Sequence, residues 1–356
     1  MFKSKYFKVI GSTVVLTLTL AACSNAKNNT QTPSPNNAET KVEQKAVSYL
    51  YTANEGGSVS KIDLSTNKVV DTIKDDGGPH NVQVSPDGKV VAYTSPGKMD
   101  SGQSQQEVMT MNGFAVFYDT QTGKLIKKVE VGNHPAHVVY TQDGKYAVVT
   151  NNSDNTLSII DAKNYTLLKN VSVGKGPHGF RISNDSKYAY IANMGEDTVS
   201  VVDIQSQKEL KKIKVGKTPV TTGITKDGKT LVVTVNSENT VAIVDLATDK
   251  VEKVAVGIGP AQLYLDFDDK YVYVANQGTE EKPSNSVTKI DLTNKQVAAT
   301  IETGKGTHGV VVSPDNKYTY ATNMYEATVS VIDNATNKVV ATIPVDKEPN
   351  GISFKK

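Results

Sequence analysis

The sequence predicts an all-β fold, a ring of seven four-stranded sheets called a β-propeller, and three observations support this prediction. From residue 46 onward the chain repeats at a period of about 42 residues. Each repeat contains four short runs that alternate apolar and polar residues and are rich in Val, Ile, Thr and Tyr. The two ends of the chain carry complementary fragments of one repeat. Small sheets of this kind bury their faces only against neighbouring sheets, which favours a closed ring.

The chain begins with a segment outside the repeats. Three lysines precede an apolar run over residues 9–22 that is too short to span a bilayer as a mature helix. These features predict a signal peptide over residues 1–22. The run ends in "LAAC", which resembles the lipobox of bacterial lipoproteins. The resemblance implies that Cys23 is lipidated and anchors the protein to the cell membrane on its extracytoplasmic face. The alternative is an ordinary secretory signal with an incidental cysteine.

A polar segment separates the signal peptide from the repeats. Residues 23–45 contain almost no apolar side chains and many Asn, Thr, Pro and Lys residues, so we expect a disordered tether. The repeats over residues 46–356 then form the propeller domain. Because Cys23 is the single cysteine, this domain has no disulfide and no thiolate metal site.

Charge argues against nucleic-acid binding. The whole chain has 39 Lys and Arg residues against 37 Asp and Glu residues. Loss of the three signal-peptide lysines leaves 36 against 37, a net charge of about −1, whereas nucleic-acid surfaces carry a strong positive excess. Arg181 is the one arginine, so paired arginines that grip phosphates are absent.

The repeat unit starts at a turn that contains Pro or Thr and continues into the first strand, as in "GPHGFRIS" and "GTHGVVVS". Runs such as "YAYIAN", "TVSVID" and "KVVATIPV" supply the other three strands. The C-terminal copy stops after its first strand, at Phe354, whereas the N-terminal copy starts with a second strand, "SYLYTAN". Pairing of these fragments would close the ring and hide both sheet edges. The seven copies start at Pro79, Pro135, Pro177, Pro219, Pro260, Thr307 and Pro349.

The repeats resemble those of the YVTN family of bacterial and archaeal surface β-propellers. The strands "YTAN", "VVTN", "YIAN", "YVAN" and "YATN", the "TVSVID" strands and the "SPDGK" turns carry this resemblance, which extends from about residue 47 to the C-terminus. It implies a seven-bladed propeller outside the cytoplasm. It implies no particular activity, because propellers support unrelated functions.

Residues that recur in every repeat are interpreted as structural. An aspartate closes each third strand, where its side chain can accept hydrogen bonds from the following turn. Asparagines that end the second strands are interpreted in the same way. Function is therefore sought where the repeats differ. Two insertions, residues 95–113 and 277–286, lie on the face that also holds the starts of the first strands and the ends of the second strands, which we call the top face.

Histidine and methionine are confined to the predicted top face of the mature domain. Imidazole and thioether ligands together suit copper, so the sequence indicates a copper site, or one for a metallo-cofactor. The structural alternative is that "PHG" is one version of the repeat's turn. His134 and the insertion methionines Met99, Met109 and Met111 lie on the same face. The candidate metal ligands are His80, His137, His178, His308, Met194 and Met324.

The predicted function is a binding or scaffold propeller, tethered to the membrane on its extracytoplasmic side, with a ligand or a protein partner on the top face. The sequence favours a role other than catalysis. One alternative is a lactonase-like or lyase-like enzyme that uses top-face histidines with carboxylates. A second is a platform for proteins or cell wall that needs no metal. The candidate carboxylates are Asp154, Glu196, Glu238 and Glu326.

Overall fold

The computed structural model describes residues 48–97 and 111–355. Ala46–Lys356 forms one compact unit. The signal peptide, Cys23, the tether, and Met99 and Met109 of the first insertion lie outside the described residues. Within the described ranges, no helix is long and apolar enough to cross a membrane.

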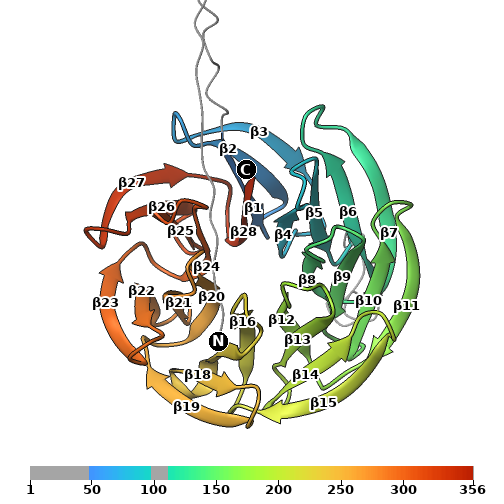
Figure 1. Cartoon of the computed structure of the whole chain (residues 1–356). Coiled ribbons are helices and arrows are strands. Elements are labelled where there is room, and N and C mark those ends of the chain that lie inside the picture. The colour runs from blue at the N-terminus through green and yellow to red at the C-terminus, as the bar shows by residue number, and fades with distance from the viewer. Residues whose placement is uncertain (1–47, 98–110, 356) are drawn as a thin grey trace, which may run out of the picture. The chain divides into compact units, whose positions relative to one another are not determined.

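The domain is a ring of seven four-stranded antiparallel sheets, which confirms the predicted fold class (Figure 1). Each sheet is one blade, and its strands are named from the centre of the ring outward. The first blade consists of β28 (Pro349–Lys355), β1 (Tyr49–Asn54), β2 (Ser58–Asp63) and β3 (Lys68–Lys74). The second consists of β4 (Val82–Val84), β5 (Val90–Ser95), β6 (Asn112–Asp119) and β7 (Leu125–Asn133). The third consists of β8 (Pro135–Tyr140), β9 (Tyr146–Asn151), β10 (Thr156–Asp161) and β11 (Thr166–Ser172). The fourth consists of β12 (Pro177–Ile182), β13 (Tyr188–Asn193), β14 (Thr198–Asp203) and β15 (Lys208–Lys214).

The remaining three blades continue around the ring in chain order. A single 3₁₀ turn, Asn236–Glu238, lies between the second and third strands of the fifth blade. The fifth blade consists of β16 (Pro219–Ile224), β17 (Thr230–Val235), β18 (Thr240–Asp245) and β19 (Lys250–Ala255). The sixth consists of β20 (Pro260–Leu265), β21 (Tyr271–Gly278), β22 (Pro283–Asp291) and β23 (Gln296–Glu302). The seventh is β24 (Thr307–Val312), β25 (Tyr318–Asn323), β26 (Thr328–Asp333), β27 (Lys338–Pro344).

The two ends of the domain share the first blade, as the sequence predicts. β1 pairs antiparallel with β28, from Tyr49 opposite Lys355 to Asn54 opposite Pro349. Leu50 of β1 is fully buried in a cluster that also holds Ile352 of β28 and Val329 of the seventh blade. The closing strand therefore joins the ring by backbone hydrogen bonds and by apolar packing on the neighbouring blade.

The recurring asparagines tie the second strand of a blade to its third strand. Asn54 is fully buried, and its Nδ2 donates to Ser58 Oγ at 3.0 Å and Ser60 Oγ at 2.9 Å. The same pair of side-chain bonds recurs at Asn151, Asn193, Asn276 and Asn323. These bonds satisfy polar groups in the space between blades, so the asparagines are structural.

The aspartates that close the third strands form the expected turns. Asp63 Oδ1, for example, accepts the backbone N–H of Ser65 at 2.7 Å. Such bonds fix the turn into the outermost strand. The equivalent acceptors are Asp119, Asp161, Asp203, Asp245, Asp291 and Asp333.

Candidate metal centre

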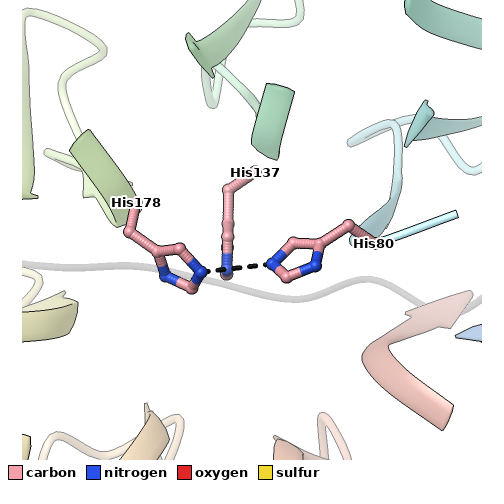
Figure 2. Close-up of side chains that lie close together, drawn as sticks. All are labelled: His80, His137 and His178. Atoms are coloured by element: carbon pink, nitrogen blue, oxygen red, sulfur yellow. Dashed lines mark hydrogen bonds between the residues drawn. The ribbon is translucent and has the colours of Figure 1, made fainter. Parts of the chain in front are cut away.

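Three of the predicted ligands meet at the centre of the ring on the top face. His80 lies two residues before the start of β4, His137 lies in β8 and His178 lies in β12, so the three come from consecutive blades. One ring nitrogen from each histidine lies within 4.8 Å of the other two. Figure 2 shows the rings turned toward one another, with that of His137 between the other two. The innermost strands converge on the ring axis, and this convergence brings the side chains together.

The partners of the Nδ1 atoms set the protonation of two of the rings. His80 Nδ1 lies 2.5 Å from Glu55 Oε1, and His178 Nδ1 lies 3.2 Å from the backbone oxygen of Val220. Both partners are acceptors, so each Nδ1 carries a proton and donates it. In the neutral rings the lone pairs are then on Nε2. These two Nε2 atoms lie 3.2 Å apart and face each other across the centre of the cluster.

His137 has an unusual environment. It is fully buried, yet neither its Nδ1 nor its Nε2 has a hydrogen-bond partner among the described residues. Its ring centroid lies 4.9 Å from that of His178 and 5.9 Å from that of His80. A buried imidazole with no partner costs free energy, and a ligand that binds nitrogen would remove that cost.

Glu55 is a member of the site that the sequence did not reveal. Its side chain accepts hydrogen bonds from His80 and from Asn350 Nδ2, the latter at 2.9 Å. Glu55 directly follows Asn54, the asparagine that ends a second strand, as Met194 follows Asn193 and Met324 follows Asn323. Aligning the repeats at that asparagine would have placed Glu55 on the top face.

The site favours neutral imidazoles at His137 and His178 beside the ionised carboxylate of Glu55. Burial and the neighbouring His80 lower the pKa of His178 to about 3. Burial, followed by the nearby histidines, holds the pKa of His137 well below its ordinary value. Burial raises the pKa of Glu55, but the hydrogen bond and positive charge of His80 outweigh it and lower that pKa to about 2. Neutral imidazole is the form that binds metal ions.

Thr150 of β9 fixes the backbone of two of the histidines. Its Oγ1 accepts the N–H of His137 at 3.0 Å and donates to the carbonyl of His178 at 2.7 Å. One hydroxyl thus joins the innermost strands of the third and fourth blades. Thr234 makes the same two bonds in the fifth blade, from Thr221 N–H and to Ala261 O. The distance between His137 and His178 therefore rests on a general device of the ring.

The other predicted ligands lie outside this group. His308 is buried, and its Nδ1 lies 3.4 Å from the backbone oxygen of Asn350. It is close enough to His80 and Glu55 for their charges to act on it. Met324 Sδ accepts a hydrogen bond from Gln277 Nε2 at 3.3 Å. Met194 is half-buried, and the cluster does not include the exposed His134.

Three of the four carboxylates of the enzyme alternative are engaged in the loops. Glu196 pairs with Lys212 at 3.0 Å, and Asp154 Oδ2 accepts the N–H of Asn133 at 2.8 Å. Glu238 accepts the N–H of Lys217 at 2.8 Å. These bonds use oxygens that an acid–base pair would need. The one carboxylate in contact with the histidine cluster is Glu55, among the residues that the structure describes.

Comparison with known proteins places the chain among propellers. Residues 108–281 match the family described as YNCE-like beta-propeller, and residues 261–351 match the family described as Cytochrome D1 heme domain. No curated protein sequence matches the chain.

Three solved structures resemble the fold. Hydrazine synthase of Kuenenia stuttgartiensis is 22% identical with a TM-score of 0.68, and the alignment covers 79% of this chain and 90% of that one. A functionally unknown protein from Desulfotomaculum acetoxidans is 14% identical with a TM-score of 0.70 and coverages of 86% and 98%. The dihydro-heme d1 dehydrogenase NirN, in complex with DHE, is 15% identical with a TM-score of 0.61 and coverages of 86% and 74%.

At sequence identities this low, the structural similarity establishes the fold alone. Function must be argued from the site. The seven blades, the shared closing blade and the YVTN-type strands are all present. The match to the YNCE-like model lies within the same repeats. The chain is a seven-bladed β-propeller of the YVTN type.

Proposed function

We propose that this protein is a metal-binding propeller, tethered outside the cell membrane, that holds one transition-metal ion through His80, His137 and His178. The observation that carries the proposal is the ring of His137, which is fully buried, has no partner for either nitrogen among the described residues and lies against the other two rings. Its neighbours present Nε2 lone pairs toward the same centre. Three lone pairs around one point form a ligand set for a cation.

The distance between two of the ligand nitrogens suits an ion, and the third nitrogen lies within 4.8 Å of both. Metal–imidazole bonds of about 2.0–2.1 Å at tetrahedral angles place two ligand nitrogens about 3.3–3.4 Å apart. The Nε2 atoms of His80 and His178 lie 3.2 Å apart. Glu55 and the Val220 carbonyl hold the far sides of these rings, as outer groups do in histidine metal sites. The His80 side chain is 20% exposed, so solvent or a further ligand can reach the fourth position.

Copper is the favoured ion. Three neutral imidazoles suit copper, zinc, iron and nickel, and copper(II) forms the tightest complexes of the divalent series at a nitrogen site. Neither Met194 nor Met324 is required for this preference. Zinc remains the competitor, because three histidines with one open position also suit zinc.

The test is metal content followed by competition titration. Full-length untagged protein should contain one equivalent of copper or zinc per chain, and copper should compete with chelators at submicromolar concentration. His178→Gln should weaken binding at least a hundredfold. His308→Asn is the matched control, since it changes a buried histidine outside the cluster, and it should bind within threefold of wild type.

Affinity weaker than micromolar, or equal loss in both variants, would contradict the proposal. A haem spectrum in the purified protein would instead favour a metallo-cofactor. The tether needs its own test, because Cys23 lies outside the described residues. Cys23→Ser should leave the protein unlipidated and move it from the membrane fraction into the soluble fraction. A variant that still carries lipid would refute the anchor.

A further inference from the structure

A second candidate site lies at the other end of the innermost strands. The histidines stand at the starts of these strands, whereas a cavity of about 270 Å³ is lined mainly by residues toward their ends, with Asn81 and Val82 of the short β4 region as exceptions. Its lining is mixed: polar groups make up more of its exposed surface than apolar ones, and a set of aromatic and aliphatic side chains forms the rest. These side chains include Tyr140, Tyr264, Phe267, Val311, Ile352 and Phe354.

Arg181, the one arginine of the chain, lies in the wall of this cavity. It follows His178 by three residues on β12. The guanidinium carbon lies 5.6 Å from the centre of the Tyr264 ring, and Nη1 donates to the Phe180 carbonyl at 2.9 Å. That carbonyl is the one acceptor within hydrogen-bond distance of the guanidinium among the described residues. The remaining four N–H donors of its planar fork are available to a ligand.

No described carboxylate neutralises Arg181. Asp87 is the one acidic residue that lines the cavity, and its Oδ1 accepts from Ser85 Oγ at 2.7 Å and from Lys89 N–H at 3.1 Å. Its second oxygen pairs with Lys89 Nζ at 3.5 Å. Arg181 is partly buried, and a partly buried guanidinium without a counter-ion favours an anion in this cavity.

An adjacent hollow of about 360 Å³ shares the Arg181 and Tyr264 walls. It contains two carboxylates, but both are engaged with backbone. Asp266 Oδ1 accepts the N–H groups of Lys270 and Tyr271, at 2.8 and 3.1 Å. Asp269 Oδ2 accepts the N–H of Lys226 at 2.7 Å. Neither is within ion-pair distance of Arg181.

Tyr140 supplies a second unpartnered polar group. Its side chain lines the cavity and is 4% exposed, and its hydroxyl has no hydrogen-bond partner in the part of the chain that the structure describes. A buried phenol hydroxyl without a partner can donate to an oxygen anion that reaches it. Arginine and tyrosine donors among aromatic walls match a carboxylate attached to an apolar body.

We propose that this cavity binds a small organic acid, with the carboxylate on Arg181 and the apolar body against Tyr264 and Phe354. The site is separate from the histidine cluster and does not depend on metal. An inorganic anion would leave the apolar walls uncovered. A neutral apolar ligand would leave the guanidinium without a counter-ion.

The test uses full-length protein and benzoate as the probe, with benzamide as its neutral isostere and inorganic phosphate as the second anion. Benzoate should bind with a dissociation constant of about 1 mM or tighter, and benzamide and phosphate at least tenfold more weakly. Arg181→Gln should weaken benzoate binding at least tenfold, and Arg181→Lys by less. Tyr140→Phe should weaken it several-fold. Lys226→Gln, which changes a cation of the adjacent hollow, is the matched control and should leave it unchanged.

Nuclear Overhauser contacts from benzoate protons to the Tyr264 ring locate the ligand independently of these variants. They keep the test decisive if Arg181→Gln fails to fold. Equal affinities for benzoate and benzamide, tighter binding of phosphate, or no binding at about 10 mM benzoate would each overturn the proposal. So would a folded Arg181→Gln protein that binds benzoate like wild type.

Discussion

His80 Nε2 lies 3.2 Å from His178 Nε2, and in the neutral rings both atoms are hydrogen-bond acceptors. Two facing lone pairs repel unless a cation lies between them. A proton on His80 would relieve this pair, but it would leave both nitrogens of His137 without a partner among the described residues. A single metal ion would bind one nitrogen of each of the three rings, which is why the metal proposal accounts for more of the geometry than protonation does.

Glu55 should strengthen metal binding without touching the ion. Its carboxylate holds His80 with the proton on Nδ1, and loss of such an outer partner lowers metal affinity about 10–100-fold. We expect Glu55→Gln to show this loss in a competition titration. Glu348→Gln, at an exposed glutamate in the loop before β28, is the control and should bind like wild type. Unchanged affinity in Glu55→Gln would mean that Glu55 does not orient the ligand.

Thr150 should affect both stability and the site. Thr150→Val removes the partners of His137 N–H and His178 C=O, which should lower the free energy of unfolding by about 2–4 kcal/mol. Metal affinity should also fall, because the two imidazoles lose their fixed spacing. Urea unfolding of the metal-free protein and metal titration measure the two effects.

Thr234→Val is the matched control, because Thr234 makes the same two bonds one blade beyond the cluster. It should lose similar stability and keep wild-type metal affinity. If Thr150→Val also kept that affinity, the shared hydroxyl would have no role in spacing the ligands.

The repeat pattern was sufficient to predict the fold. Which residues form the site depends on which strand ends meet at the ring axis, and the repeat pattern does not specify this. The period, the four runs and the complementary ends predicted every blade and the β1–β28 closure. The sequence placed Met194 and Met324 among the candidate ligands beside the histidines. The structure instead groups histidines from adjacent blades, because first strands start at the ring axis and second strands lie one strand spacing, about 4.8 Å, farther out.

Two further groups could not have been predicted from residue type. The position of Glu55 in the repeat indicates the top face, but only the structure shows its contact with His80. In the sequence, Arg181 indicated only that paired arginines are absent. Its role in the cavity depends on the absence of any described counter-ion around it. Both depend on burial and on neighbours from other blades, which a period does not encode.

The closing strand should be essential for cooperative folding. Deletion of residues 349–356 removes β28, which leaves β1 with an unpaired edge at the centre of the ring and exposes Leu50. We expect aggregation or a broad unfolding transition in circular dichroism and size-exclusion chromatography. Deletion of residues 355–356 alone, which spares nearly all of the pairing, should keep a sharp transition. A monomeric protein with unchanged melting after the longer deletion would refute the importance of closure.

His308 should make the metal-free protein sensitive to acid. Burial, then the charge of His80, lowers the pKa of His308 to about 4 in the folded protein, against about 6.5 in the unfolded chain. Between these values the unfolded chain binds more protons, so stability falls as the pH falls from about 6.5 toward 4. Glu55, whose pKa is about 2, stays ionised throughout this window.

His308→Asn removes this contribution and places at position 308 the residue type found at the equivalent position of the last repeat, Asn350. At about 1.4 kcal/mol for each pKa unit, wild type should lose about 2–3 kcal/mol more unfolding free energy than the variant between pH 7 and pH 4. Urea unfolding in the presence of a chelator measures both proteins at both pH values. His178 titrates in both proteins, so its contribution cancels in the comparison. Identical pH dependence would show that His308 is not held neutral by its surroundings.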